Sequence, residues 1–197
     1  MLEVSIVRHM PRGEKANEGA TRVRNLDVPN GFIHPLFYKK GDKIKADEFR
    51  PFPLMMKDIY FYYDIIASHE LTEDKPWQYN HYSIPAVLKL WESEKEHLSI
   101  LFQCRDRKSA KEPMIRALSY FLSCLFWLNG APVKNVVNWE REVEALQIKP
   151  INCAERLHFI FTNIDLYHAS IQLGELFHEL TKMLYKYKAM GGRLQTR

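Results

Sequence analysis

Cysteine is scarce in this chain: Cys104, Cys124 and Cys153 are the only three, and they lie far apart. An odd number of widely spaced cysteines makes neither a complete disulfide framework nor the paired spacing of a zinc site. Each has apolar neighbours, so we expect all three to be small buried side chains in a reducing compartment. The cytoplasm is the simplest such location.

Long apolar runs are also missing. The longest stretch, "ALSYFLSCLFWL" at residues 117–128, contains serines and is about half of the roughly 20 residues that a membrane span needs. The residues after Arg8 are polar and contain Pro11 and Gly13, which argues against a signal peptide. We therefore expect a core helix at residues 117–128 and no membrane association.

No strong charge of one sign marks the chain. The formal net charge is +4 and the pI is about 8.9, a balance that permits a nucleic-acid partner without requiring one. There is no internal repeat and no glycine-rich loop that would hold a phosphate. These absences exclude the common nucleotide-binding motifs.

Arg8 and His9, in "VSIVRHMPRGEK", resemble the Arg-His-Gly motif of histidine phosphatases. Met10 stands where that motif needs a glycine for the phosphate to approach, and Pro11 follows. The rest of the chain does not alternate strands with helices as a parallel sheet requires. We interpret this stretch as an exposed basic turn.

The chain is predicted to be all-α, a single-domain bundle of about six helices with an irregular, loop-rich N-terminal extension. Residues 1–55 hold most of the glycines and many prolines, so we expect turns there and a strand only at residues 2–7. Residues 133–137 are the other candidate strand. Residues 56–197 form the helical domain, and the N-terminal extension packs on it.

The expected helices follow from caps and apolar periodicity, with Ser83 and Ser109 predicted to cap the second and third and Asp165 the last. The third is apolar on nearly all sides and is expected at the centre of the bundle. The six predicted ranges are 57–68, 83–103, 109–128, 138–146, 153–162 and 165–190.

Three Glu-x-x-His pairs could supply metal ligands as ferritin-like bundles do. In the second and third pairs, helical phase places the carboxylate and imidazole away from the apolar face, and only Glu94 lies within an apolar stripe. One inward pair does not form a dinuclear centre, so we predict no metal, no other cofactor and no catalytic set. The pairs are Glu94 with His97, Glu155 with His158, and Glu175 with His178.

Glu94 is the polar residue that most needs a partner, because an unpaired buried carboxylate costs several kcal/mol. Arg116 lies on the narrow polar side of the third helix, which a short turn joins to the second. We predict that Glu94 and Arg116 form a polar pair. A structural role is favoured over a catalytic one.

The C-terminal stretch is rich in cations and has no acid after Glu179. Such residues complement a helix dipole, and interleaved tyrosines could also contact a nucleic acid. The candidate basic contact surface comprises Lys182, Lys186, Lys188, Arg193 and Arg197.

The segments "IKPINCAERLHFI" and "LYHASIQLGELFHEL", with the looser "PWQYN", "VLKLWE" and "FWLNGAPV", resemble the YpoC-like family of small uncharacterised bacterial proteins. The resemblance covers about residues 58–188. It implies a cytoplasmic helical protein without an assigned activity, and it supplies no catalytic residues.

Two classes of function remain open. The favoured one is a non-enzymatic module that binds another macromolecule, with a protein partner preferred over a nucleic acid. The alternative is a small enzyme, with or without a metal, whose site forms between helices.

Overall fold

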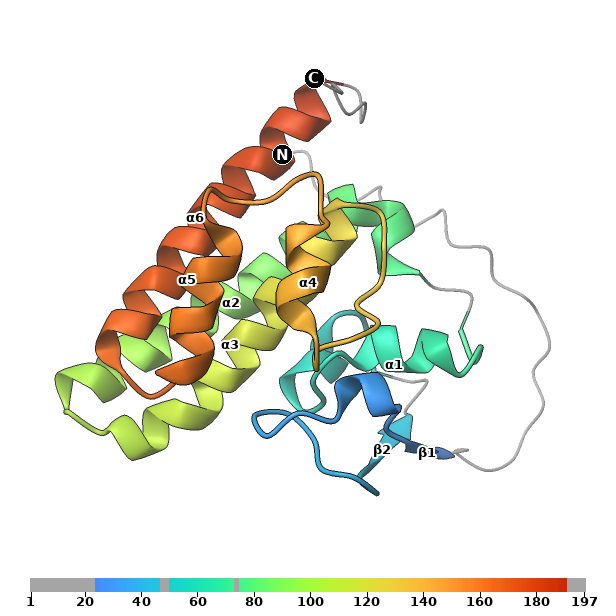
Figure 1. Ribbon diagram of the computed structural model, residues 1–197, viewed down its shortest axis with the longest axis horizontal. Coiled ribbons are helices and arrows are strands. Elements are labelled where there is room, and N and C mark those ends of the chain that lie inside the picture. Colours follow the sequence, from blue (N-terminus) through green and yellow to red (C-terminus); the bar gives the residue numbers. More distant parts are fainter. Residues whose placement is uncertain (1–23, 47–49, 73–74, 191–197) are drawn as a thin grey trace, which may run out of the picture.

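The computed structural model describes residues 24–46, 50–72 and 75–190, and this part of the chain is mostly helical (Figure 1). Six α-helices and one small sheet are formed there. The helices are α1 (Tyr62–Ser68), α2 (Asn80–Gln103), α3 (Arg107–Leu128), α4 (Trp139–Glu144), α5 (Cys153–Thr162) and α6 (Tyr167–Ala189).

Helix α3 lies at the centre of the core, as its sequence predicted. Every side chain from Ala117 to Leu128 is buried. The helix packs along α2 and also contacts α6. A helix that is apolar on all sides is stable only when other elements cover every side. The composition of α3 was therefore enough to predict its central position.

Short strands form where the sequence did not predict them. Strand β1 (Arg24–Asp27) pairs antiparallel with β2 (Lys43–Ala46). Both are short and rich in charge. Ile44 and Ala46 are buried and Leu26 is partly buried against the core, which gives only a weak period-2 signal. The predicted strand at residues 2–7 lies outside the described residues.

The predicted strand at residues 133–137 is wrong, because this segment is irregular. Its backbone donors bind groups outside any sheet: Val133 N donates to the Asp64 carboxylate and Val136 N donates to the carbonyl of Gly31 at 2.7 Å. The apolar character of Val133 and Val136 reflects burial in the core.

Part of the N-terminal extension belongs to the core. Phe32, Phe37 and Met55 are buried together with the helices. The Phe37 ring packs edge-on against Phe161 of α5, with centroids 6.1 Å apart. Figure 1 shows the sheet and α1 gathered at one end of the molecule, away from the far end of α6.

Several predicted helix starts are wrong: of α2, α3 and α6, α3 alone has a side-chain cap, and that cap is not the predicted residue. Asp106 caps α3 by accepting from Ser109 N at 3.0 Å, so the helix starts before Ser109. Helix α2 starts at Asn80, and Ser83 inside it donates to the carbonyl of Pro76. Asp165 precedes the α6 cap and pairs with Arg107.

At the N-terminal side of the bundle, residues 54–57 form a 3-10 turn, so α1 is shorter than predicted. Helix α5 has the predicted bounds. None of the helices in the described ranges combines the length and apolar character that crossing a membrane requires.

Candidate functional site

Glu94 and Arg116 are in direct contact across the α2–α3 interface. Arg116 Nη1 donates to Glu94 Oε1 at 2.8 Å, and 12% of the Glu94 side chain and 23% of the Arg116 side chain are exposed. Burial lowers the pKa of Arg116, but the hydrogen bond and charge of Glu94 outweigh it and raise the pKa overall. The predicted contact is therefore present and charged.

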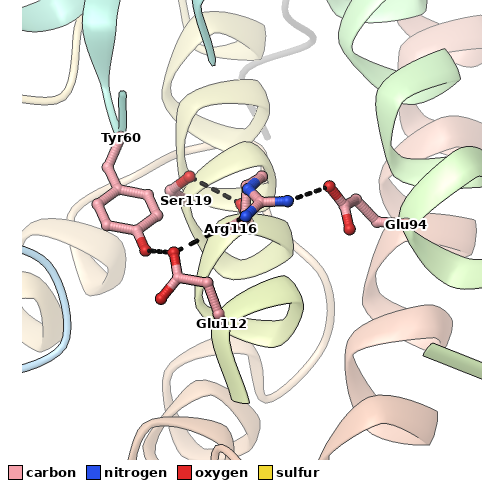
Figure 2. A network of polar contacts seen from close by, with 5 residues as sticks. All are labelled: Tyr60, Glu94, Glu112, Arg116 and Ser119. Atoms are coloured by element: carbon pink, nitrogen blue, oxygen red, sulfur yellow. Dashed lines mark hydrogen bonds and ion pairs between the residues drawn. The ribbon is translucent and has the colours of Figure 1, made fainter. Parts of the chain in front are cut away.

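The pair belongs to a larger polar network (Figure 2). Glu112 Oε1 lies 3.8 Å from Arg116 Nη2 and accepts from the Tyr60 hydroxyl. Burial and the Glu112 hydrogen bond raise the pKa of Tyr60, so its phenol stays protonated and donates. Ser119 Oγ donates to the Arg116 carbonyl at 2.7 Å.

This network joins α2 and α3 to the segment before α1. Its one cation, Arg116, contacts both of its carboxylates, Glu94 and Glu112. The nearby Tyr120 hydroxyl is buried with no hydrogen-bond partner among the described residues. None of these side chains lines the groove between α2 and α6 that is described below. The arrangement favours a structural role over contact with a substrate.

Asp64 is a buried carboxylate that the sequence reasoning missed. Its Oδ1 accepts from Trp127 Nε1 and from Val133 N, each at 2.9 Å, and its Oδ2 lies 3.3 Å from Ser123 Oγ. Burial raises its pKa to about 7, against the opposing effect of these donors. The only available signal was an acid among four apolar neighbours within α1.

Two of the Glu-x-x-His pairs are exposed as predicted: Glu155 with His158, and Glu175 with His178. His158 Nδ1 lies 2.8 Å from Glu140 Oε1, on another helix. In the third pair Glu94 is engaged by Arg116 while His97 is exposed. The described residues contain no group of three or more metal-ligating side chains.

The cysteine prediction holds for two of three residues. Cys124 and Cys153 are buried free thiols, and burial raises the pKa of Cys153 to about 12. Cys104 is exposed, contrary to the prediction, because it lies at the C-terminal cap of α2 where the chain turns toward α3. The incorrect prediction of burial came from its apolar sequence neighbours Leu101 and Phe102.

An open groove of about 430 Å³ runs between α2 and α6. The ring of Trp91, on its floor, stacks on Phe177 with centroids 4.3 Å apart and planes 9° from parallel. Gly174 faces the same floor: an added Cβ would lie 3.8 Å from the Trp91 ring. The lining residues are Trp91, Lys95, Leu98, Ser99, Phe102, Tyr167, Ser170, Ile171, Gly174, Glu175 and His178.

Apolar and charged side chains share this groove. Tyr167 is 54% exposed and Ile171 is 46% exposed, although both have large apolar surfaces. Lys95 on α2 and Glu175 on α6 are charged and exposed. Sequence reasoning had placed Glu175 on the solvent side, but only the packing of α2 against α6 shows that both residues border one groove.

The candidate basic surface is partly described. Lys182, Lys186 and Lys188 are exposed on the C-terminal half of α6 and form no ion pair with the other described residues. Tyr185 beside them is 63% exposed. Arg193 and Arg197 lie outside the described residues.

Residues of the segments that resemble the YpoC-like family meet between α5 and α6. Arg156 Nε donates to Gln172 Oε1 at 3.1 Å, and its Nη1 donates to Glu179 Oε1 at 2.7 Å. Asn129 exchanges hydrogen bonds with the backbone of Ile148, both at 2.8 Å. These contacts fix loops and helix pairs of the bundle.

Comparison with known proteins agrees with this pattern. The model of the YpoC-like protein family matches residues 81–192, which include α2 to α6. "Uncharacterized protein YpoC" of Bacillus subtilis (strain 168) is 36% identical over 129 residues, covering 66% of this chain and 77% of that protein. No solved structure matches. With its sequence matched across the helical body, this chain belongs to the YpoC-like family.

Proposed function

We propose that this protein is a non-enzymatic helical module that binds another macromolecule through the groove between α2 and α6. The observation that carries the proposal is the pair of half-exposed side chains, Tyr167 and Ile171, beside an aromatic floor. Large apolar groups that remain exposed around a concave surface are typical of interaction sites.

A protein partner fits this groove better than a nucleic acid does. Lys95 and Glu175 bring opposite charges to the groove, whereas a phosphate backbone requires a row of cations. The free cations Lys182 and Lys186 lie beyond the groove lining, toward the end of α6. A helical segment with apolar side chains would cover Tyr167 and Ile171 by the helix-in-groove mode.

The alternative is a small enzyme with a site between helices. The same groove holds His178 and Glu175, which could act as acid or base toward a bound ligand. Both side chains are exposed, and the described residues offer no third ligand for a metal beside them. The binding role is therefore preferred, and we place it in the cytoplasm because Cys124 and Cys153 are free thiols.

The experiment is affinity capture from a bacterial lysate with quantitative mass spectrometry. It compares the natural chain with Ile171→Glu in the groove and Ile100→Glu as the matched control, since Ile100 is 60% exposed on α2 but does not line the groove. We expect specific proteins to be captured by the natural chain and the control and lost with Ile171→Glu. Equal capture by all three would contradict the proposal.

Salt separates the two kinds of macromolecule. Apolar burial is insensitive to moderate salt, so capture of a protein partner should persist as salt rises. For a DNA duplex held by about five cations, log affinity would instead fall against log salt with a slope of about 4 to 5. A steep slope that disappears when residues after Tyr185 are deleted would favour the nucleic-acid role of the basic surface.

A further inference from the structure

Lys95 and Glu175 lie on opposite helices of the groove and do not pair with each other. Lys95 Nζ has one ion-pair contact in the described residues, Glu92 Oε2 at 4.0 Å along its own helix. Glu175 has none among the described residues. Each therefore offers an exposed charge at the edge of an apolar groove.

Ring contacts define how the two helices are aligned. Phe102 packs against Tyr167 with centroids 5.6 Å apart, and Trp91 stacks on Phe177. Helices α2 and α6 are therefore antiparallel. Lys95 lies between Trp91 and Phe102 on one helix, and Glu175 lies between Tyr167 and Phe177 on the other, so the two charges are at a similar level.

This arrangement is self-complementary. A two-fold axis that runs parallel to the groove, in the plane between two facing copies, places α2 of one copy over α6 of the other. Lys95 of each copy then faces Glu175 of the other, giving two equivalent ion pairs, as an isologous interface requires. Tyr167 and Ile171 lie toward the end of the groove where Phe102 of α2 is level with Tyr167. The same rotation keeps them at that end and places them over α2 of the other copy.

We propose that the occupant of this groove is a second copy of the chain, paired through α2 and α6 about a two-fold axis. This inference rests on the proposed function, because it names a partner for the same surface. Burial of Tyr167 and Ile171 supplies affinity, and the Lys95–Glu175 pairs set orientation. A different helical partner with charges of one sign would be repelled by either Lys95 or Glu175, because one of the two has the same sign.

The test is sedimentation velocity of the purified full chain across a wide range of concentration, with four variants: Lys95→Glu, Glu175→Lys, the double exchange, and Lys111→Glu. Lys111 is exposed on α3 outside the groove, so it is the control for the same change in charge. Circular dichroism and thermal unfolding verify that each variant folds.

We expect a monomer–dimer equilibrium in the natural chain and in Lys111→Glu. Each single groove reversal should raise the dimer Kd by roughly tenfold or more, because it places like charges opposite one another. The double exchange should restore dimerisation, since the two charges are again opposite in sign across copies. A monomer at every concentration, or a double exchange as weak as the single variants added together, would overturn the inference.

Failure of this inference and of the proposed function can be told apart. If the chain is monomeric while Ile171→Glu still abolishes lysate capture, the second-copy inference is wrong and the groove binds a different protein. If the charge exchange restores a dimer while capture is unchanged by Ile171→Glu, self-association is supported and a heterologous partner in the groove is contradicted.

Discussion

Glu94 and Arg116 form a charged hydrogen bond that is largely shielded from water, with 12% and 23% of their side chains exposed. At this depth each charge depends on the other, because removing one leaves its partner poorly solvated. Glu112 gives Arg116 a second, longer contact at 3.8 Å and cannot fully replace Glu94.

We predict that Glu94→Ala or Arg116→Ala alone lowers the free energy of unfolding by about 2 to 4 kcal/mol. Replacing both with apolar residues should cost less than the two single losses together, because neither charge is then stranded. Urea unfolding of the two single variants and the double variant measures this cycle. Additive losses would show that the contact contributes no coupling.

Asp64 makes a pH-dependent contribution to stability. Burial raises its folded-state pKa from 3.8 to about 7, so the folded protein binds the proton more tightly than the unfolded chain does. The stabilisation from the neutral acid is complete below pH 3.8 and is lost as pH rises through 7. Burial raises the pKa of the nearby Cys124 thiol, and the charge of Asp64 raises that pKa further.

The Asp64→Asn variant is therefore predicted to be more stable than the natural chain at pH 8 and to differ little near pH 4. The amide keeps an oxygen for Trp127 and Val133 and carries no charge. The rise in the pKa of Asp64 from 3.8 to about 7 corresponds to a stability change on the order of 4 kcal/mol at most. Urea unfolding at both pH values tests the sign, and destabilisation by Asn at pH 8 would show that the ionised carboxylate is the native form.

At the level of elements, residues 30–32 attach to residues 133–137 at a point where the two backbones lie very close together. Gly31 lies in the 3-10 turn Asn30–Phe32, and its carbonyl accepts from Val136 N at 2.7 Å. A Cβ at this position would come within 2.2 Å of the Lys134 carbonyl oxygen. The atoms that this Cβ would meet belong to the backbone of Lys134 and Asn135, which cannot move aside as a flexible side chain can.

We predict that Gly31→Ala destabilises the protein and loosens the contact between residues 30–32 and residues 133–137. Asn30→Ala, at an exposed neighbouring position whose side chain makes no hydrogen bond in the described ranges, is the control and should have little effect. Thermal unfolding gives the stability change, and hydrogen exchange at Val136 N reports the local opening. Equal stability of the two variants would contradict the steric argument.

At the scale of the whole molecule, the side chains of the three Glu-x-x-His pairs lie on helix surfaces or in a contact between helices. The Glu155–His158 and Glu175–His178 pairs are exposed, and Glu94 is bound to Arg116. A transition metal needs three or more convergent ligands for tight binding.

We predict that the purified protein contains no stoichiometric iron, manganese or zinc and that a chelator leaves its thermal unfolding midpoint unchanged. Elemental analysis by mass spectrometry, alongside melting curves with and without the chelator, provides the measurement. One metal ion per chain, lost together with stability on chelation, would favour the enzyme alternative.

The fold class and the order of helices were predictable because apolar periodicity and helix breakers are local properties. The bounds of α5 and the central place of α3 followed from these signals. Helix starts were less predictable. Asp106 caps α3 ahead of the predicted Ser109 cap, and the 3-10 turn Pro76–Tyr79 leads into α2 at Asn80, ahead of the predicted Ser83 cap.

The sequence by itself determined which segments become helices and that Glu94 needs a cationic partner, since burying a carboxylate carries a large desolvation cost wherever it occurs. Only the tertiary structure decided that Asp64 would be held between α3 and residue 133, and that α2 and α6 would leave a groove between Lys95 and Glu175. These features join residues far apart in the chain. Their geometry depends on how whole helices pack, and no local pattern encodes it.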